Sequence, residues 1–340
     1  MTSPKRTLLA ALVAPLSVLL ATGCGETRTT LRVFGADSLA ASFREIEGAF
    51  EKLHPDIDVQ VNTLGSVMVA RVAPERGADL VALADHRLVE KVLTPKHTSW
   101  VVKFVTTEIV LAYTTASKRR ADITPDNWFD ILLDPQIRYG CARPNQDPCG
   151  YYTRISWQLA QNHYFTSRGQ TRPLVKQLID QLPPERIARD ANALVGEQLN
   201  MARIDYAFVY RTHAVDHKLP FITLPREINL GDATLANLYA AAEGTAPDYK
   251  GGSEMLKGAP IAFGISIFDN TPHPKAAKAF VRFVLSDQGL AILERSQFRP
   301  IRPALVPPWS QVPEFLSDLA VPENAQAPAA RPAAKPTTGS

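Results

Sequence analysis

Apolar residues along the first third of the chain follow two alternating spacings. Short apolar runs with many branched side chains predict strands at residues 31–36, 58–64 and 78–85. Between the first two runs, apolar residues recur at intervals of four and three, the spacing of one helix face: Leu39, Phe43, Ile46, Phe50 and Leu53. A second helix is expected from Gly65-Ser66 to Arg71. This alternation predicts an open parallel sheet with helices on its faces.

The same pattern restarts after a strand predicted at residues 108–113. Helical runs alternate with strand-like runs. We expect the helices at 127–134, 150–164 and 193–203. We expect the strands at 137–142, 185–190, 205–211, 221–225 and 260–267. An amphipathic helical region over 273–294 breaks near Ser286. We therefore predict an α/β protein of two lobes, formed by residues 31–110 plus 262–305 and by residues 113–260. Two crossings between the lobes, at about residues 110 and 262, imply a hinge and a ligand cleft.

Both ends of the chain have the composition of segments outside the folded body. Basic residues at 5–6 precede an apolar run over 8–20, which is short for a membrane span and typical of a signal peptide over residues 1–23. Small residues before Cys24 fit a lipoprotein signal with Cys24 as the lipidated residue, and an ordinary cleaved signal is the alternative. Residues 306–340 are rich in proline and alanine and predict a largely disordered tail. We expect an exported protein on the periplasmic or extracellular face.

Composition narrows the classes of function. The 340 residues are 45% hydrophobic and 21% charged, which suits two compact lobes. The formal net charge of +3 and the absence of a basic block argue against nucleic acid. No later run reaches the length of a membrane-spanning helix.

Three strand-to-helix turns carry the candidate chemistry: Asp37-Ser38, Gly65-Ser66 and Asp147-Pro148. All three follow predicted strands, and open parallel sheets bind ligands at that edge. Each serine hydroxyl stands beside free N–H groups of a helix start, which together bind an oxyanion through donors rather than formal charge. Asp147 suits an N-cap and Pro148 the first helical position, so capping alone is the alternative.

The sequence contains no catalytic motif that we recognise. It lacks a G-x-S-x-G elbow, an H-E-x-x-H pair and a glycine-rich phosphate loop. Cys141 and Cys149 could form a disulfide in an oxidising compartment, or remain two thiols, and their spacing is not a zinc pattern. Cys149 with His213 could form a nucleophile pair, which would make the protein an exported thiol enzyme, although no third orienting group is evident.

Several segments between residues 31 and 300 carry a more specific pattern: GADSLAASFREIEGAFEKLHPDIDVQ, LGSVMVARV, ADLVALAD, EIVLAYT, NWFDILLDPQIRYG, PNQDPCGYY, DYAFVYR, LPREINLGD and PIAFGISI. In this order they resemble the tungstate/molybdate-binding proteins of ABC importers, particularly the archaeal-type group. The resemblance implies a class II periplasmic-binding fold. Two lobes, each a mostly parallel sheet flanked by helices, would close on a bare oxyanion.

The resemblance also implies a set of ligand-binding residues. By position, the oxyanion shell would include the following residues: Ser38, Ser66, Asp147, Pro148, Cys149 and Tyr210. In that family two acids approach the metal atom of the oxyanion, and Asp147 matches the first of them. Molybdenum and tungsten can accept such extra oxygen donors, whereas the phosphorus and sulfur of phosphate and sulfate cannot.

Three residues depart from the pattern of that family. Asn192 stands where the second acid is expected, and it offers only a neutral carbonyl oxygen. Asp37 stands in place of a glycine. One hypothesis is that it supplies the missing acid from the opposite lobe. The alternative is that it faces solvent or caps its helix. Arg143 replaces a small polar residue and could pair with Asp37 or the ligand, or lie on the surface.

Together these features predict a lipid-anchored substrate-binding protein of an ABC importer that binds molybdate or tungstate. We expect it to act as a monomer, to use no cofactor, to catalyse no reaction, and to deliver the ion to an ABC permease and its ATPase. The lipid on Cys24 would be its only contact with the membrane. Because of Asn192 and Asp37, binding of another small oxyanion, such as sulfate or phosphate, remains an alternative.

Overall fold

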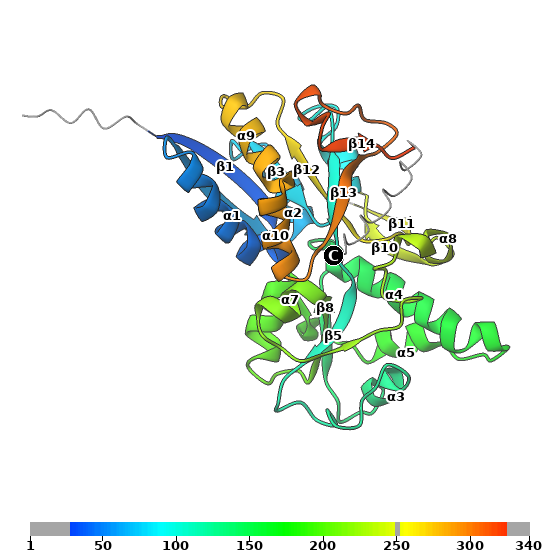
Figure 1. The fold of residues 1–340 in the computed structure, drawn as a ribbon. Coiled ribbons are helices and arrows are strands. Elements are labelled where there is room, and N and C mark those ends of the chain that lie inside the picture. The colour runs from blue at the N-terminus through cyan, green and yellow to red at the C-terminus, as the bar shows by residue number, and fades with distance from the viewer. Residues whose placement is uncertain (1–27, 249–251, 325–340) are drawn as a thin grey trace, which may run out of the picture.

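The computed structural model describes residues 28–248 and 252–324. They form two bodies, one above the other in Figure 1, each with a sheet and flanking helices. We call the seven-stranded sheet with its helices lobe 1, and the five-stranded sheet with its helices lobe 2. The α/β class predicted from the sequence is confirmed.

Lobe 1 combines the first and last parts of the described chain. Its strands are β1 (Thr29–Ala36), β2 (Ile57–Leu64), β3 (Leu80–Leu83), β4 (Val102–Thr106), β12 (Ala262–Ile267), β13 (Arg299–Val306) and β14 (Ala320–Pro322). Its helical segments are η1 (Asp37–Leu39), α1 (Ala40–Leu53), α2 (Ser66–Val72), η2 (Val89–Leu93), α9 (Pro274–Leu285), α10 (Asp287–Arg295) and η7 (Glu314–Leu316). The apolar face predicted for α1 is buried except at its end, where Leu53 is exposed. Phe50 of α1 packs edge-on against Phe280 of α9, with ring centroids 5.3 Å apart.

The sheet of lobe 1 is mixed, with strand order β14-β13-β4-β12-β3-β1-β2. Strands β3, β1 and β2 run parallel, as the sequence predicts, but β12 is antiparallel to both β3 and β4. The expectation of a mostly parallel sheet is therefore wrong. The physical reason is the path of the chain: β4 leads toward lobe 2 and β12 leads back, so the two strands run in opposite directions.

Lobe 2 has the strand order β7-β6-β8-β5-β9 and a separate hairpin. Its strands are β5 (Ile109–Tyr113), β6 (Tyr139–Ala142), β7 (Ile187–Ala188), β8 (Tyr206–Tyr210) and β9 (Phe221–Thr223), and the hairpin is β10 (Glu243–Pro247) with β11 (Ser253–Lys257). Its helical segments are α3 (Trp128–Leu132), α4 (Pro148–Tyr164), η3 (Thr166–Arg168), α5 (Leu174–Asp180), η4 (Pro184–Arg186), α6 (Ala191–Ala193), η5 (Leu194–Leu199), α7 (Arg211–Asp216), η6 (Ala233–Leu235) and α8 (Ala236–Tyr239). This sheet is also mixed, because β8 pairs parallel with β6 and antiparallel with β5.

A buried carboxylate marks the first crossing between the lobes. Glu108, 2% exposed, lies between β4 and β5. Its oxygens accept hydrogen bonds from Arg211 Nε at 2.6 Å and from Arg299 Nη2 at 2.6 Å, and Asn229 adds a third at 3.2 Å. Because Arg211 belongs to lobe 2 and Arg299 to lobe 1, this acid ties the two lobes together where the chain passes between them.

The C-terminal region corrects a second expectation. Residues 306–340 were expected to form a largely disordered tail, but β14 pairs parallel with β13 and extends the sheet of lobe 1. Leu316, between these strands, is buried, so apolar packing holds this proline-rich stretch in place. Residues 325–340 and the predicted signal peptide with Cys24 lie outside the described residues.

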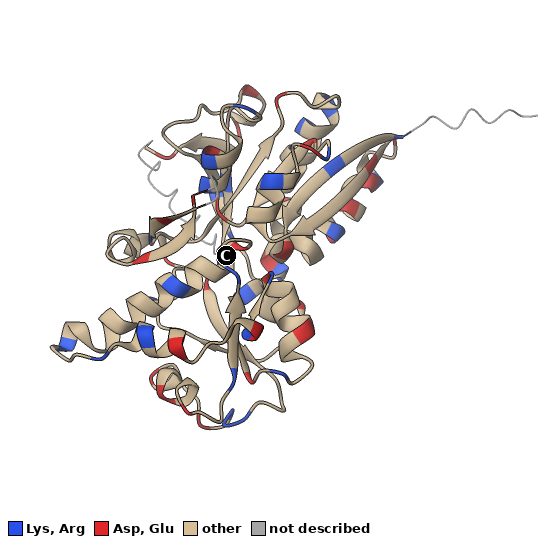
Figure 2. Cartoon of the chain, turned by 180° about the vertical axis from the view of Figure 1, so that it is seen from behind, with Lys and Arg blue, Asp and Glu red and all other residues tan. Residues whose placement is uncertain are grey.

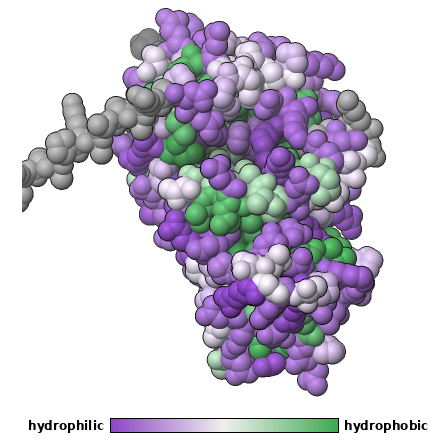
Figure 3. Space-filling view, turned by 90° about the vertical axis from the view of Figure 1, so that its right-hand side faces the viewer, coloured by the Kyte–Doolittle hydropathy of each residue, from purple (hydrophilic) through white to green (hydrophobic). Residues whose placement is uncertain are grey.

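Surface features agree with the weak net charge. Figure 2 shows basic and acidic residues interspersed over both lobes in that view, without a face of one sign. The face drawn in Figure 3 is mostly hydrophilic, with a patch of hydrophobic residues near its middle. Within the described part of the chain, none of the helices has the length and apolar character needed to span a membrane.

Candidate functional site

Strand-to-helix turns from both lobes meet at the boundary between the lobes. Lobe 1 contributes the turns that hold Asp37-Ser38 and Ser66, and lobe 2 contributes Asp147 at the start of α4. In addition, Tyr210 ends β8 and leads into α7. The lobes touch here: a Cβ added to Gly65 would lie only 2.5 Å from the carbonyl oxygen of Gln146. The three turns that the sequence singles out are thus brought together, at the carboxyl ends of their strands.

Asp147 is the N-cap of α4, as predicted from its position before Pro148. Its side chain is fully buried, and Oδ1 accepts the backbone N–H of Cys149 at 2.9 Å. Oδ2 accepts the N–H of Ala191 at 2.9 Å, so one carboxyl group serves the starts of two helices. Burial, together with the nearby charge of Asp37, raises the pKa of Asp147 well above its ordinary value.

Asp37 joins the two lobes. It is 3% exposed, so the solvent-facing interpretation is wrong. Oδ1 accepts the N–H of Ser38 at 2.9 Å, while Oδ2 accepts the N–H of Asn192 at 3.1 Å and lies 3.3 Å from Nε2 of His213. Burial alone would raise the pKa of Asp37, but the charge of His213 and these hydrogen bonds outweigh it and lower that pKa.

His213 is the counterion that the site contains. Its side chain is 1% exposed. Burial lowers the pKa of His213, but the charge of Asp37 more than compensates, and the pKa lies above its ordinary value. These directions favour an ion pair of Asp37 and His213 beside an Asp147 that binds its proton more tightly than an ordinary aspartate. From the sequence, His213 is a candidate only as the partner of a thiol, although its place after Tyr210, in another strand-to-helix turn, is a signal for this site.

Several buried polar atoms around the turns lack a partner within the described residues: Ser38 Oγ, Tyr210 Oη, Thr212 Oγ1 and His213 Nδ1. An unsatisfied buried polar group costs about 1–3 kcal/mol, so such a concentration calls for an explanation. Ser66 Oγ accepts the N–H of Ala84 at 2.9 Å, which leaves its hydroxyl hydrogen available to donate. The site thus places hydrogen-bond donors without partners among the described residues beside helix N-termini, an arrangement that binds anions.

Asn192 and Arg143 have ordinary structural roles. The Asn192 side-chain amide donates to the carbonyl oxygen of Asp37 at 3.1 Å, and its Oδ1 lies 3.2 Å from Nε2 of His217. Asn192 therefore contributes to the contact between the lobes. Arg143 is exposed, as its surface interpretation expects.

Cys141 and Cys149, the two cysteines among the described residues, are both buried and free, so the disulfide considered for them is not formed in this structure. Cys141 lies in β6, whereas the thiol of Cys149 lies 3.8 Å from the carbonyl oxygen of Phe208 in β8. Burial raises the pKa of Cys141 to about 11 and that of Cys149 well above its ordinary value. Because a thiol attacks as the thiolate, this environment disfavours the nucleophile pair of Cys149 and His213.

Among residues 28–248 and 252–324, no three His, Cys, Asp or Glu side chains are placed to hold a metal ion together. The acids at this site are engaged with backbone N–H groups and with His213 instead.

Comparisons with known proteins place this geometry in context. The model of the family "Bacterial extracellular solute-binding protein" matches residues 31–299. An uncharacterized solute-binding protein of Petrotoga mobilis is 34% identical over 290 residues, which cover 84% of this chain and 88% of that protein. The molybdate/tungstate-binding protein WtpA of Pyrococcus abyssi is 30% identical over 338 residues, with 89% and 95% covered.

Solved structures show the same fold at low identity. The periplasmic molybdate-binding protein of Azotobacter vinelandii aligns with a TM-score of 0.54 and 15% identity over 79% of this chain and 98% of that one. The sulfate-binding protein SubI of Mycobacterium tuberculosis aligns with a TM-score of 0.58 and 14% identity over 87% and 93%. These two resemblances show the fold alone.

Proposed function

Because this chain belongs to the bacterial extracellular solute-binding proteins, we propose that it is the substrate-binding component of an ABC importer for molybdate or tungstate. The observation that carries the proposal is the set of buried, unpartnered hydroxyls at helix starts between the lobes. Its similarity to proteins named as molybdate/tungstate-binding supports the same ligand class. The fold is that of class II periplasmic binding proteins, in which two lobes enclose the ligand.

The anion would be bound mainly through neutral donors. The hydroxyls of Ser38 and Ser66 from lobe 1 and of Tyr210 from lobe 2 would donate to its oxygens. Because these donors come from both lobes, an anion of the wrong size could not reach all of them in one closed form. Closure would thus provide size discrimination.

The acids would contact the central atom of the anion. Asp147 is the candidate from lobe 2. Asp37 is the candidate from lobe 1, where Asn192 and His213 hold its carboxylate. It would replace the second acid, which is missing at position 192. Molybdenum and tungsten accept further oxygen donors. The positive charge on His213 offsets part of the negative charge that two acids and the anion would bring together.

The remaining roles follow from this assignment. The protein would be exported, anchored through lipidated Cys24, and would act as a monomer that presents the loaded, closed form to a permease and its ATPase. It would catalyse no reaction and need no cofactor, since the oxyanion is the transported ligand.

A second candidate is another small oxyanion, such as sulfate or phosphate. Asn192 favours it, because this amide is committed to the contact with Asp37 and supplies no second acid in the expected position. On this alternative Asp37 and Asp147 would serve only as acceptors for backbone N–H groups.

Calorimetry on the purified mature protein tests the choice between them. Molybdate, tungstate, sulfate and phosphate are titrated separately after removal of bound anions. We expect the two metal oxyanions to bind at least a hundredfold more tightly, because only they gain the contacts of the acids; a hundredfold corresponds to about 2.7 kcal/mol. Tighter binding of sulfate or phosphate than of both metal oxyanions would contradict the proposal.

X-ray absorption on the loaded protein tests the acid contacts separately. We expect oxygen neighbours of the metal beyond those of the free oxyanion. If only the four oxygens of the tetrahedral anion are found, Asp147 and Asp37 do not touch the metal. In that case the donors of the serines and Tyr210 would account for binding alone.

A further inference from the structure

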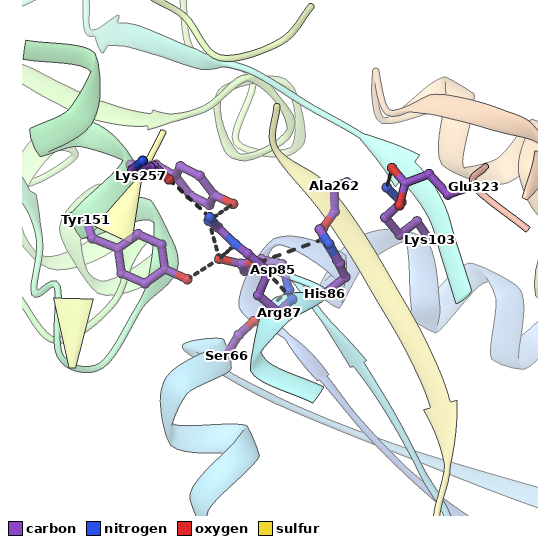
Figure 4. Close-up of polar contacts among 11 residues, drawn as sticks. Ser66, Asp85, His86, Arg87, Lys103, Tyr151, Lys257, Ala262 and Glu323 are labelled. Carbon is purple, nitrogen blue, oxygen red and sulfur yellow. Dashed lines mark hydrogen bonds and ion pairs between the residues drawn. The ribbon is translucent and has the colours of Figure 1, made fainter. Parts of the chain in front are cut away.

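A second polar contact between the lobes lies away from the turns that would bind the anion. We call it the tyrosine network and define it as Asp85, Arg87, Tyr151 and Tyr152. Figure 4 shows Arg87 and Tyr151 reaching the carboxylate of Asp85, close to Ser66. Asp85 and Arg87 follow β3 in lobe 1, whereas both tyrosines lie in the first turns of α4 in lobe 2.

The half of the network in lobe 1 is a buried ion pair. Asp85 is 1% exposed. The guanidinium of Arg87 donates to both of its carboxylate oxygens, from Nε to Oδ1 at 2.9 Å and from Nη2 to Oδ2 at 2.8 Å. Burial would raise the pKa of Asp85, but Arg87 outweighs it and holds that pKa well below the usual range. Both groups are therefore charged, and both belong to lobe 1, so the pair survives when the lobes separate.

The half in lobe 2 supplies polar groups to that ion pair. Tyr151 Oη donates to Oδ2 of Asp85 at 2.7 Å, and Arg87 Nη2 donates to Tyr152 Oη at 2.8 Å. Arg87 Nη1 also donates to the carbonyl oxygen of Lys257, in the hairpin of lobe 2, at 3.1 Å. These three hydrogen bonds cross between the lobes, so they exist only in the closed form.

The network connects directly to the elements of the candidate site. Ala84, the neighbour of Asp85, donates its N–H to the hydroxyl oxygen of Ser66. Tyr151 follows Asp147, the N-cap of α4, by one helical turn. The network therefore joins the strand end that orients Ser66 to the helix that carries Asp147, across the boundary between the lobes.

We infer that Asp85, Arg87, Tyr151 and Tyr152 are positioning residues that stabilise the closed form and hold the two halves of the oxyanion site in register. The inference rests on the proposed function, since it assigns these residues to the affinity of that same site. A ligand held by donors from both lobes binds tightly only to the closed form. Its apparent affinity therefore scales with the population of that form.

Removal of the two hydroxyls tests the inference with little disturbance of packing. The variants are Tyr151→Phe, Tyr152→Phe and the double variant, and the matched control is Tyr164→Phe. Tyr164 lies in the same helix, but its hydroxyl donates within lobe 2, to the carbonyl oxygen of Pro125 at 2.6 Å. The control therefore loses a hydroxyl hydrogen bond that opening of the lobes does not break.

Calorimetry with molybdate and tungstate, and the dissociation rate, give the main result. A net hydrogen bond is worth a factor of roughly 3 to 10, so the double variant, which loses two, should bind about 10- to 100-fold more weakly and release the anion faster. Its melting temperature should fall no further than that of Tyr164→Phe, whose affinity should stay at the wild-type value. Wild-type affinity in the double variant would overturn the inference.

Small-angle scattering of the ligand-free proteins separates this inference from the proposed function. If the wild type binds neither anion, the proposed function fails, and scattering alone decides about the network. A larger radius of gyration in the double variant than in the wild type and the control would support the closing role. Equal radii in all three proteins would then overturn it.

Discussion

The unpartnered hydroxyl of Tyr210 gives the sharpest prediction, because its loss should affect stability and binding in opposite directions. Tyr210 is fully buried, and Oη has no hydrogen-bond partner within the described residues. If this hydroxyl exists to bind the anion, the ligand-free protein gains nothing from it. Tyr210→Phe should therefore leave the ligand-free protein equally stable or stabilise it by up to about 1 kcal/mol.

The loss of affinity follows from the charge of the ligand. A hydrogen bond to a charged group contributes about 1.5–3 kcal/mol, so Tyr210→Phe should bind molybdate roughly 10- to 150-fold more weakly. Urea unfolding of the ligand-free protein measures the stability, and titration calorimetry measures the affinity. Both experiments are needed on the same preparation, because the prediction concerns their opposite signs.

Tyr139→Phe is the matched control. Tyr139 is equally buried, but its hydroxyl donates to the carbonyl oxygen of Leu178 inside lobe 2. This change should cost about 1–2 kcal/mol of stability, because it leaves that carbonyl group without its partner, and should leave the affinity unchanged. Our reasoning would be refuted if Tyr210→Phe behaved like Tyr139→Phe, with stability lost and affinity retained.

Two further predictions concern closure and protonation. Gly65→Ala should bind the anion at least tenfold more weakly, because the new Cβ would meet Gln146 across the lobe boundary. Its stability should stay within about 0.5 kcal/mol of wild type, since a φ of −53° suits alanine. Gly48→Ala, whose Cβ has open space, is the control, and normal affinity in Gly65→Ala would contradict the closed geometry. The ligand-free protein should lose stability in urea as the pH rises from about 7 to 9, because the raised pKa values of Asp147 and His213 both mean that the folded state binds more protons than the unfolded state there. Below that range the lowered pKa values of His86 and His217 act in the opposite direction. The lowered pKa of Asp37 acts only at lower pH, so a stability that rises over this range would contradict the assigned shifts.

Local signals predicted most of the architecture around the site. The runs at residues 31–36, 58–64 and 78–85 correspond to β1, β2 and β3, and Asp147-Pro148 begins α4 as its capping chemistry indicates. Such signals depend on neighbours along the chain, which is why they could be read without the structure. The helix break near Ser286 is another example, because Ser286 caps α10 with a hydrogen bond to the N–H of Gly289.

Features that depend on distant residues were missed or wrong. Asp37 and His213 are 176 positions apart, and no periodic pattern links them. The directions of β4 and β12 follow from the path between the lobes, so local composition could not show that the sheet is mixed. The proline-rich end was predicted as disordered because composition does not reveal that β13 offers β14 a free edge to pair with.

The position of the anion itself tests the central claim most directly. Crystals of the mature protein grown with tungstate would be measured at the tungsten absorption edge, where the metal gives a strong anomalous signal. We predict one dominant peak between the lobes, with the anion oxygens within hydrogen-bond reach of Ser38, Ser66 and Tyr210 and the Asp147 carboxyl group against the metal. A dominant peak elsewhere on the molecule, or an empty boundary between the lobes at saturating tungstate, would contradict the account.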